Sequence, residues 1–205
     1  MFPNFQKQYV ATSRVASTAP GLATLPPESF GHVTDAIKFL VDYEGTTFTR
    51  ELYRLLSLCT TEKWNRLIVA AFPDYEGRIW PFGCDWLGKM FVLDSQTMEN
   101  GTPMVLMMEL GTGYVLQIPA TFKNFHEEQL IENADPALAV TALEEWMMSH
   151  PVDLRRYSWE VRMNLRISRS PILRSIGRLT AKSWRRRADC RTAQKSARLL
   201  YRLRC

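Results

Sequence analysis

Hydrophobic residues gather most densely in the stretch GRIWPFGCDWLGKMFVLD, residues 77–94. Its bulky residues form two runs, 79–82 and 86–93, and Gly83-Cys84-Asp85 separates them. Two short apolar runs joined by a turn are typical of paired strands. Because a buried large aromatic side chain removes about 150–250 Å² from water, the stretch predicts two neighbouring strands around which a hydrophobic core forms.

Apolar residues before this stretch predict two helices and a strand. The first helix begins at Thr34 and ends before Gly45, and residues 52–58 form the strand. The second helix begins at Thr60 or Thr61, because apolar residues then recur at intervals of three and four until a proline stops the helix. These apolar residues are Trp64, Leu67, Ile68, Ala71 and Phe72.

Turn signals after the stretch predict further strands. Asn100-Gly101 marks one turn, and strands at 104–110 and 114–118 flank a Gly-Thr-Gly turn. Pro119 is expected to close this hairpin. The fold class is therefore α+β, with an antiparallel or mixed sheet between N-terminal and C-terminal helices.

The C-terminal helices are predicted from their start signals. Residues 122–133 form one helix, and Asp135-Pro136 begins the next, with Asp135 as the cap and the proline in the first helical position. Ala139, Ala142 and Leu143 share one face of this last helix with Trp146. The structural core of the domain is predicted from its largest side chains, which are Trp64, Trp80, Phe82, Phe91 and Trp146.

Charge divides the chain into parts. Residues 1–150 hold 10 Lys and Arg against 18 Asp and Glu, a balance of −8, and residues 151–205 hold 16 against 3, a balance of +13. Residues 1–30 are rich in Ser, Thr, Ala and Pro, which predicts a flexible leader. We therefore expect an α+β domain over residues 31–150, followed by an Arg-rich tail that packs poorly.

Composition predicts a protein of the cytoplasm. The 205 residues are 46% hydrophobic, yet no apolar run approaches the roughly 20 residues that span a bilayer. The N-terminus lacks the charged and then apolar order of a signal peptide. Four cysteines show no CxxC motif and no regular spacing, so they predict neither a disulfide framework nor a zinc site.

Catalytic motifs are missing from the sequence. His32 and His150 are isolated, and His126-Glu127-Glu128 is interpreted as a solvated surface, because adjacent helical residues point in different directions. Gly111-x-Gly113 lacks the Lys and Ser/Thr of a phosphate loop. Cys84 is interpreted as a turn or buried cysteine. We expect no enzyme activity, no metal and no cofactor.

Several motifs together resemble one known family. They are ELYRLLS, TEKWNRLIVAAFPDYEGRIWPFGCDWLGKMFVLD, GTGYVLQIP and IPATFKNFHEEQL, and the similarity covers about residues 31–148. This order resembles the GAD-related immunity proteins of type VI secretion, of the type that protects bacteria from DNase toxins. The broader Smi1/Knr4-like immunity superfamily is the second resemblance. Both imply a cytoplasmic protein that binds and neutralises a cognate secreted toxin.

The partner surface is predicted at the turn between the aromatic strands. There Asp85 and Trp86 would present a charge beside an aromatic anchor. The alternative interpretation places Trp86 in the core. An acidic domain would also attract a basic, DNA-handling toxin.

The tail has two interpretations. Arginine clusters with interspersed aromatic residues could bind nucleic acid or an anionic membrane through phosphate groups, which makes a nucleic-acid-binding accessory protein the alternative function. The second interpretation is a frameshift, since the resembled family continues with a segment like LGGKDELENLEISDxxVYWxxxGQ. In the shifted frame, the single codon of Trp159 forces Gly with Glu160, and that of Met163 forces Glu with Asn164. Permitted codons then spell LGGKDELENLEISD across residues 158–171. We favour the frameshift, which leaves the tail only non-specific affinity for nucleic acid.

Overall fold

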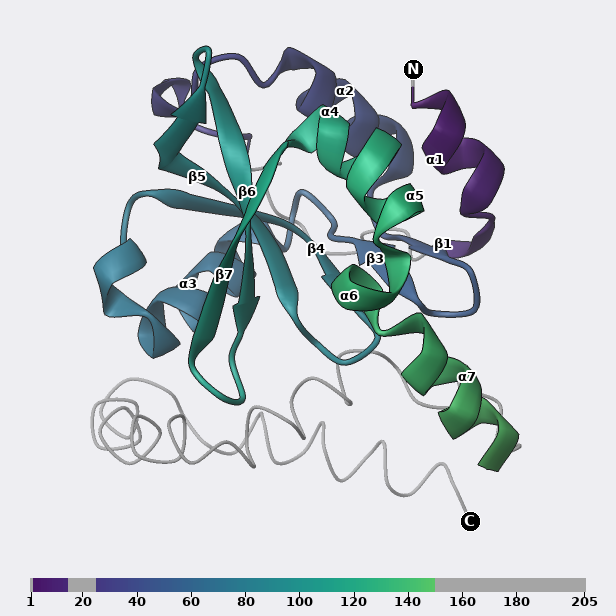
Figure 1. Cartoon of the computed structure of the whole chain (residues 1–205). Coiled ribbons are helices and arrows are strands. Elements are labelled where there is room, and N and C mark those ends of the chain that lie inside the picture. The colour runs from purple at the N-terminus through teal and green to yellow at the C-terminus, as the bar shows by residue number, and fades with distance from the viewer. Residues whose placement is uncertain (1, 15–24, 150–205) are drawn as a thin grey trace, which may run out of the picture.

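The computed structural model describes residues 2–14 and 25–149 and shows an α+β fold (Figure 1). Seven strands form one sheet in the order β1-β2-β3-β4-β5-β6-β7, and every neighbouring pair is antiparallel. The predicted fold class is confirmed. The strands are β1 Ala11–Arg14, β2 Thr46–Phe48, β3 Tyr53–Leu55, β4 Ile79–Asp85, β5 Met90–Glu99, β6 Thr102–Glu109 and β7 Tyr114–Thr121.

Helices cover both faces of the sheet. The larger core lies under α1, α2 and the helical run from α4 to α5, and the smaller core lies under α3 (Figure 1). The α-helices are α1 Pro3–Gln8, α2 Thr34–Tyr43, α3 Thr61–Ala71, α4 Phe122–Asn124, α5 Leu130–Glu132, α6 Ala134–Leu138 and α7 Val140–Ser149. Two 3-10 turns, η1 Glu28–Phe30 and η2 Pro73–Tyr75, and a π-helical turn, η3 Phe125–Gln129, complete the described elements.

Four of the five predicted core residues are confirmed. Trp64 and Trp80 are 2% and 3% exposed, and Phe82 and Phe91 are fully buried. Trp64 packs in the core under α3, whereas the other three lie in the larger core. Trp146 is a correction, because it is only half-buried near the end of α7.

The connection between the aromatic strands lies later than predicted. Strand β4 continues through Gly83-Cys84-Asp85, and the turn to β5 consists of residues 86–89. Gly83 pairs with Leu55 on one side and Phe91 on the other, so it belongs to the sheet. A Cβ atom at Gly83 would lie 2.8 Å from the hydroxyl of Tyr53, and glycine therefore leaves room for that ring.

The predicted flexible leader is wrong for its first part. Residues 2–14 form α1 and β1, and residues 15–24 lie outside the described residues. Phe2, Phe5 and Tyr9 recur at helical spacing and are all at most 3% exposed. Three aromatic residues suffice to dock this polar segment on the core, because each buries a large area. The domain therefore includes residues before 31.

The other predicted boundaries hold in part. Helices α2 and α3 lie where the apolar spacing predicted them, and residues 122–132 are continuously helical. Strand β7 runs through Pro119, which therefore does not close the hairpin. Helix α6 begins before Asp135, and the Asp135 carboxylate accepts instead from the backbone N–H of Thr141 at the start of α7, at 2.7 Å. Of the predicted inner face, Leu143 is buried and Ala142 is exposed. The Arg-rich tail lies outside the described residues.

Candidate functional site

Asp85 closes the turn between the two central strands. Its carboxylate Oδ1 accepts a 2.7 Å hydrogen bond from the backbone N–H of Lys89, and its own N–H donates to the Lys89 carbonyl at 3.1 Å. Gly88 in this turn has a φ of 86°, a conformation that glycine adopts without steric cost. Asp85 is only 1% exposed. Asp85, predicted as an exposed charge at a partner surface, is therefore the buried last residue of β4.

Burial changes the acidity of Asp85. Loss of solvation raises the pKa of its carboxyl to about 7, although the hydrogen bond and the charge of Lys89 oppose this rise. The second oxygen, Oδ2, is buried without a hydrogen-bond partner among the described residues. A carboxyl in this environment exchanges its proton near neutral pH, and this property affects the stability of the fold.

Trp86 connects the same turn to the C-terminal helices. Its indole Nε1–H donates to the carbonyls of Leu138 and Ala139 at 3.0 and 3.3 Å. Its ring centre lies 6.5 Å from that of Trp146 in α7. Ala139 has a φ of 52° and separates α6 from α7. Half-buried Trp86 therefore anchors the junction of these two helices within the domain.

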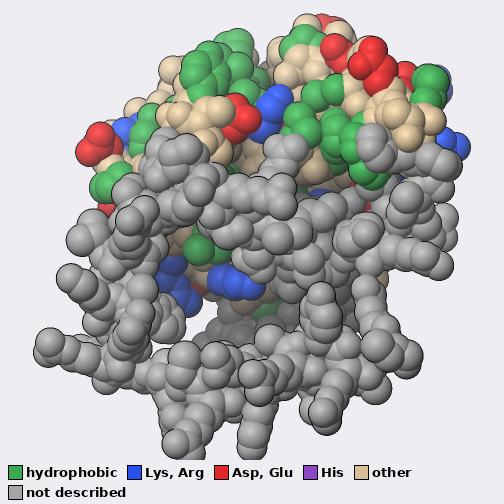
Figure 2. Space-filling view, turned by 90° about the horizontal axis from the view of Figure 1, so that it is seen from below, with side chains coloured by type: hydrophobic (Ala, Val, Ile, Leu, Met, Phe, Trp, Pro, Cys, Tyr) green, Lys and Arg blue, Asp and Glu red, His purple; other side chains and the backbone are tan. Residues whose placement is uncertain are grey.

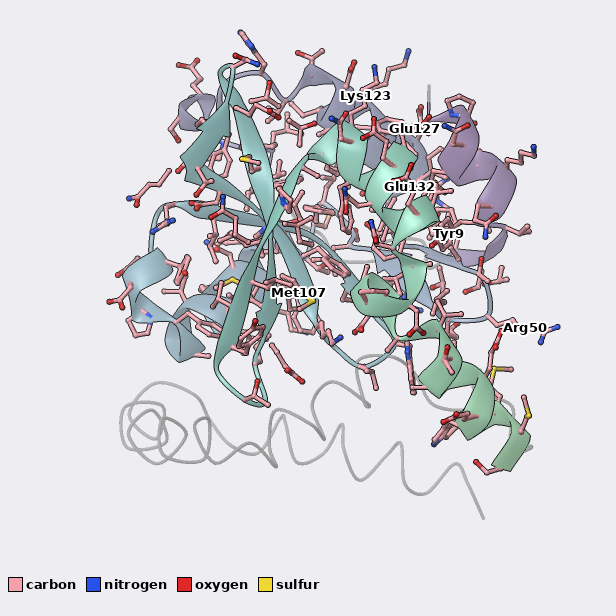
Figure 3. The ribbon with its side chains drawn as sticks, in the orientation of Figure 1. Tyr9, Arg50, Met107, Lys123, Glu127 and Glu132 are labelled. Carbon is pink, nitrogen blue, oxygen red and sulfur yellow. The ribbon has the colours of Figure 1, made fainter. Side chains whose placement is uncertain are left out.

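The C-terminal helices carry a one-sided charge. From Asn124 to Ser149 the chain holds six carboxylates and no Lys or Arg, and we call residues 127–145 the acidic surface. These carboxylates are Glu127, Glu128, Glu132, Asp135, Glu144 and Glu145, and all except half-buried Glu127 are exposed. Helices α5, α6 and α7 follow one another along one side of the molecule to the end of the described chain (Figure 1). Figure 3 shows Glu127 and Glu132 in succession along the first part of this side.

The rest of the described surface is more balanced. Outside the acidic surface, 7 acidic and 7 basic side chains are exposed among the described residues. In the view from below, hydrophobic side chains lie between acidic and basic ones on the visible part of the domain (Figure 2). The acidic surface is therefore the most strongly charged segment of the domain. The charge of Lys89, in the turn before β5, contributes to lowering the pKa of Asp135 on this surface.

The run His126-Glu127-Glu128 is not a solvated surface, which corrects the prediction. His126 is fully buried, and its ring nitrogens form hydrogen bonds with the hydroxyl of Tyr53 at 2.9 Å and the carbonyl of Phe122 at 2.8 Å. Burial lowers the pKa of His126 to about 3, so the ring is neutral at physiological pH. Only Glu128 of the run is exposed.

Glu127 holds the first helix on this part of the domain. Its carboxylate accepts from the backbone N–H groups of Asn4 and Phe5 at 3.4 and 3.2 Å. A negative charge at a helix N-terminus is favourable because the first N–H groups have no partner inside the helix. These roles of His126 and Glu127 could not be predicted, because Tyr53, Asn4 and Phe5 lie far away in the chain.

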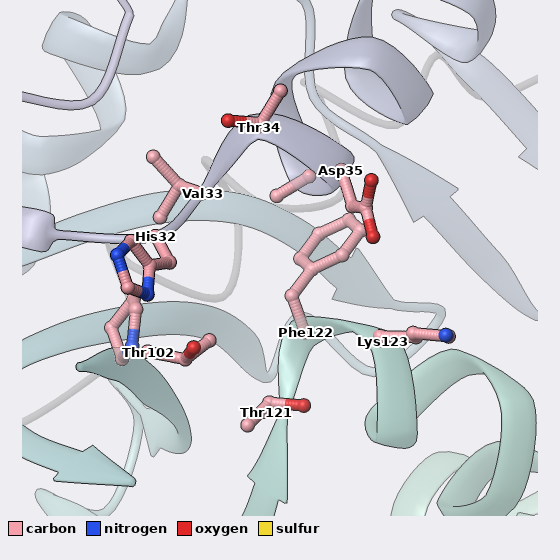
Figure 4. A pocket seen from close by; sticks show the side chains of 10 residues that line it. His32, Val33, Thr34, Asp35, Thr102, Thr121, Phe122 and Lys123 are labelled. Atoms are coloured by element: carbon pink, nitrogen blue, oxygen red, sulfur yellow. The ribbon is translucent and has the colours of Figure 1, made fainter. Parts of the chain in front are cut away.

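A polar cleft lies where α2 begins beside the junction of β7 and α4. Its volume is about 370 Å³, and Figure 4 shows its lining side chains. The polar members come from separate segments and are His32, Thr34, Asp35, Thr102, Thr121 and Lys123. The sequence left His32 isolated, and only the fold brings it near the other groups. Hydroxyl, imidazole, ammonium and carboxylate groups of this kind suit a small polar ligand or a side chain of a partner.

Other reactive groups contribute no site within the described ranges. Cys84 is buried in β4, as predicted, and residues 2–14 and 25–149 contain no group of His, Cys, Asp and Glu that could hold a metal ion. In the same ranges, no helix has the length and apolar character needed to cross a bilayer. In comparisons with known proteins, the chain matches no protein-family model and no curated protein.

Proposed function

We propose that this protein is an immunity-type inhibitor, which binds a cognate toxin of a type VI secretion system and neutralises it in the cytoplasm of the producing bacterium. It acts by binding, without catalysis and without a cofactor. The toxin handles DNA and is basic. The proposal starts from the resemblance of residues 31–148 to the GAD-related immunity proteins.

One observation supports a basic partner most directly, namely the acidic surface. Six carboxylates without a neighbouring Lys or Arg in the sequence segment create a negative potential along η3 to α7. A DNA-handling protein carries the opposite charge where it contacts phosphates. Complementary potentials speed association and orient the partners.

The most specific part of the resembling motifs, the stretch 77–94, is mostly buried and stabilises the fold. The stretch 77–94 supplies β4 and the start of β5, whose residues in these positions are buried without exception from Ile79 to Asp85 and from Met90 to Asp94. A partner therefore reaches residues outside this stretch. Half-buried Trp86 lies at the edge of the C-terminal helices, so a toxin that is bound to the acidic surface lies close to it.

The experiment uses the full chain and the candidate toxin encoded beside its gene. We compare a neutralised variant, E128Q/E132Q/E144Q/E145Q, with a control variant that removes the same charge elsewhere, E28Q/D74N/E76Q/E99Q. All eight residues are exposed. We expect the first variant to associate with the toxin on the order of tenfold more slowly, because surface charges act mainly on association, and the control to resemble the wild type.

The second measurement is protection. Cells that express the toxin should grow when they also express the wild-type chain. No binding and no protection by the wild-type chain would refute the proposal. If both variants associate equally slowly with the toxin, the protein is still an inhibitor, but the acidic surface is not part of its interface with the toxin.

The alternative function, a nucleic-acid-binding accessory protein, is favoured by the charge of residues 151–205, with 16 basic and 3 acidic residues. Ending the chain after Ser149 separates the two functions. Toxin binding that persists while DNA binding disappears favours the inhibitor. Loss of a sequence-specific DNA interaction favours the accessory protein.

A further inference from the structure

The polar cleft beside the start of α2 has an apolar floor. The floor residues are buried and come from three segments of the chain, namely Val33, Ala36, Pro103 and Phe122. The volume of about 370 Å³ lies within the range of about 300–1,000 Å³ in which proteins bind small molecules. A site of this kind accepts the carbon skeleton of a ligand on its floor and fixes the polar groups of the ligand at its rim.

Three backbone donors belong to the wall of this cleft. Val33 stands at the cap position of α2 and provides no side-chain acceptor. The N–H groups of Thr34, Asp35 and Ala36 therefore have no acceptor within residues 2–14 and 25–149. An oxygen atom with negative charge is favourable at this position, because the first N–H groups of a helix form its positive end.

Side chains from other segments add further donors to the rim. Lys123 at the start of α4 is exposed and forms no ion pair within the described residues. Thr102 contributes a hydroxyl, and so does Thr121, which accepts from the Asn124 N–H at 3.4 Å and keeps its own hydrogen to donate. Asp35 supplies the single carboxylate among the lining residues. Because donors outnumber acceptors, the matching ligand is an anion rich in acceptor oxygens.

The fold holds the His32 side of the cleft in place. The backbone N–H of His32 donates to the Gly101 carbonyl at 2.9 Å, and a Cβ atom at Gly101 would lie 3.5 Å from Nδ1 of the His32 ring. The ring therefore lies against the turn between β5 and β6. Figure 4 shows His32 and Lys123 on opposite sides of Phe122, with Asp35 on the side of Lys123.

We propose that this cleft binds the phosphate group of a small molecule that also carries hydroxyl groups, such as a sugar phosphate. The phosphate oxygens accept from the N–H groups of α2, the ammonium of Lys123 and the threonine hydroxyls. Asp35 accepts from a hydroxyl of the same ligand, which selects hydroxylated phosphates over inorganic phosphate. This inference does not depend on the proposed function and uses none of the carboxylates of the acidic surface.

Isothermal titration calorimetry of the full-length protein tests the site with ribose 5-phosphate, inorganic phosphate and ribose. Lys123→Gln removes a charge from the cleft, and the control Lys63→Gln removes the same charge from α3, on the other face of the sheet. Attraction of phosphate to basic residues elsewhere in the chain is thus equal in both variants. We expect Lys123→Gln to weaken binding of ribose 5-phosphate by at least about tenfold, and the control to stay within about twofold of the wild type. No binding by the wild type, or equal affinities of the two variants, would overturn the proposal.

Thr34→Asp separates ligand binding from folding. A carboxylate in the first turn of α2 stabilises the helix, whereas it repels a phosphate in the cleft. We expect the free variant to melt at or above the wild-type Tm. Ribose 5-phosphate at about 100 times its dissociation constant should raise the wild-type Tm by about 5 to 10 °C and leave the Tm of the variant unchanged. An equal rise in both proteins would place the ligand outside the cleft and refute the site.

Asp35→Asn tests the part of the site that selects the ligand. We expect this variant to bind inorganic phosphate more tightly than the wild type does, because a repelling charge is removed. It should also lose the wild-type preference for ribose 5-phosphate over inorganic phosphate. Equal affinity of the wild type for both compounds would mean that the cleft binds free phosphate, which contradicts the proposed role of Asp35.

Discussion

Replacing Asp85 by Asn is expected to reveal two opposing titrations in the core. The folded domain raises the pKa of Asp85 from 3.8 to about 7. The folded state therefore holds the proton more tightly than the unfolded state. Its stabilising effect is complete below pH 3.8 and is lost as the pH rises through 7. The difference corresponds to about 4 kcal/mol of unfolding free energy.

His126 acts with the opposite sign. Burial lowers its pKa from 6.5 to about 3, so the folded state favours the neutral ring. Its contribution is complete above pH 6.5 and is lost as the pH falls through 3, a difference of about 5 kcal/mol. Between about pH 4 and 6.5 the two effects nearly cancel, and the wild-type unfolding free energy should change little with pH.

The Asn variant removes one of these effects. Its side-chain oxygen can still accept from the Lys89 N–H, as Oδ1 of Asp85 does. We expect its unfolding free energy to fall by about 1.4 kcal/mol per pH unit as the pH drops from about 6.5 to 4, and to exceed the wild-type value by up to about 4 kcal/mol near pH 8.

Urea denaturation followed by tryptophan fluorescence measures these values at a series of pH values. Asp135→Asn is the control, because the Thr141 N–H lowers the pKa of this exposed carboxyl and places its titration below the window. Parallel curves for the wild type and the Asp85 variant between about pH 4 and 8 would refute the titration of Asp85 in this range.

Three further predictions test other parts of the structure. Trp86→Phe removes the indole N–H at the α6–α7 junction; we expect a loss of about 1 to 2 kcal/mol in urea denaturation and faster hydrogen exchange in α7, whereas unchanged exchange would contradict the anchor. Gly31→Ala places a Cβ atom 2.3 Å from the Gly101 carbonyl oxygen, while Gly77→Ala meets nothing within 4 Å at a similar φ, so the first should cost at least about 2 kcal/mol more in the same assay; equal losses would argue against this contact. An accurate read of the gene around codons 150–158 and of sibling copies should show a small insertion or deletion that restores LGG…VYW, and an intact frame with the same tail in siblings would end the frameshift interpretation.

Much of the fold could be predicted because its helices and turns follow from local sequence signals. Helix α3 follows from the spacing of Trp64 and Ile68, and Asn100 and Gly101 both have the positive φ that their turn signal predicts. The end of β4 could not be found in this way. A strand that is buried on both faces is expected to appear as one continuous apolar run. The small residues Gly83 and Cys84 interrupt this run, and they were therefore interpreted as part of a turn.

The candidate site was less predictable because its groups depend on distant partners. Asp85 was expected at the surface as a consequence of the misplaced turn. His126 was expected beside exposed glutamates, but the π-helical turn and Tyr53 place its ring inside the domain. Leader residue Phe5 has its carboxylate partner, Glu127, 122 positions later in the chain. A contact between residues this far apart in the chain leaves no local sequence pattern from which it could be predicted.

The order of the strands has a consequence for synthesis of the protein. Each strand pairs with the next one along the chain, so hairpins from β2 onward can form while the ribosome is still working. Helix α1 is made first, yet Glu127 must be present to cap it and the Leu130 carbonyl must be present to accept from the Tyr9 hydroxyl. We therefore expect the earliest helix to dock last, with Phe2 and Phe5 accessible to chaperones until the emerging chain has passed residue 130.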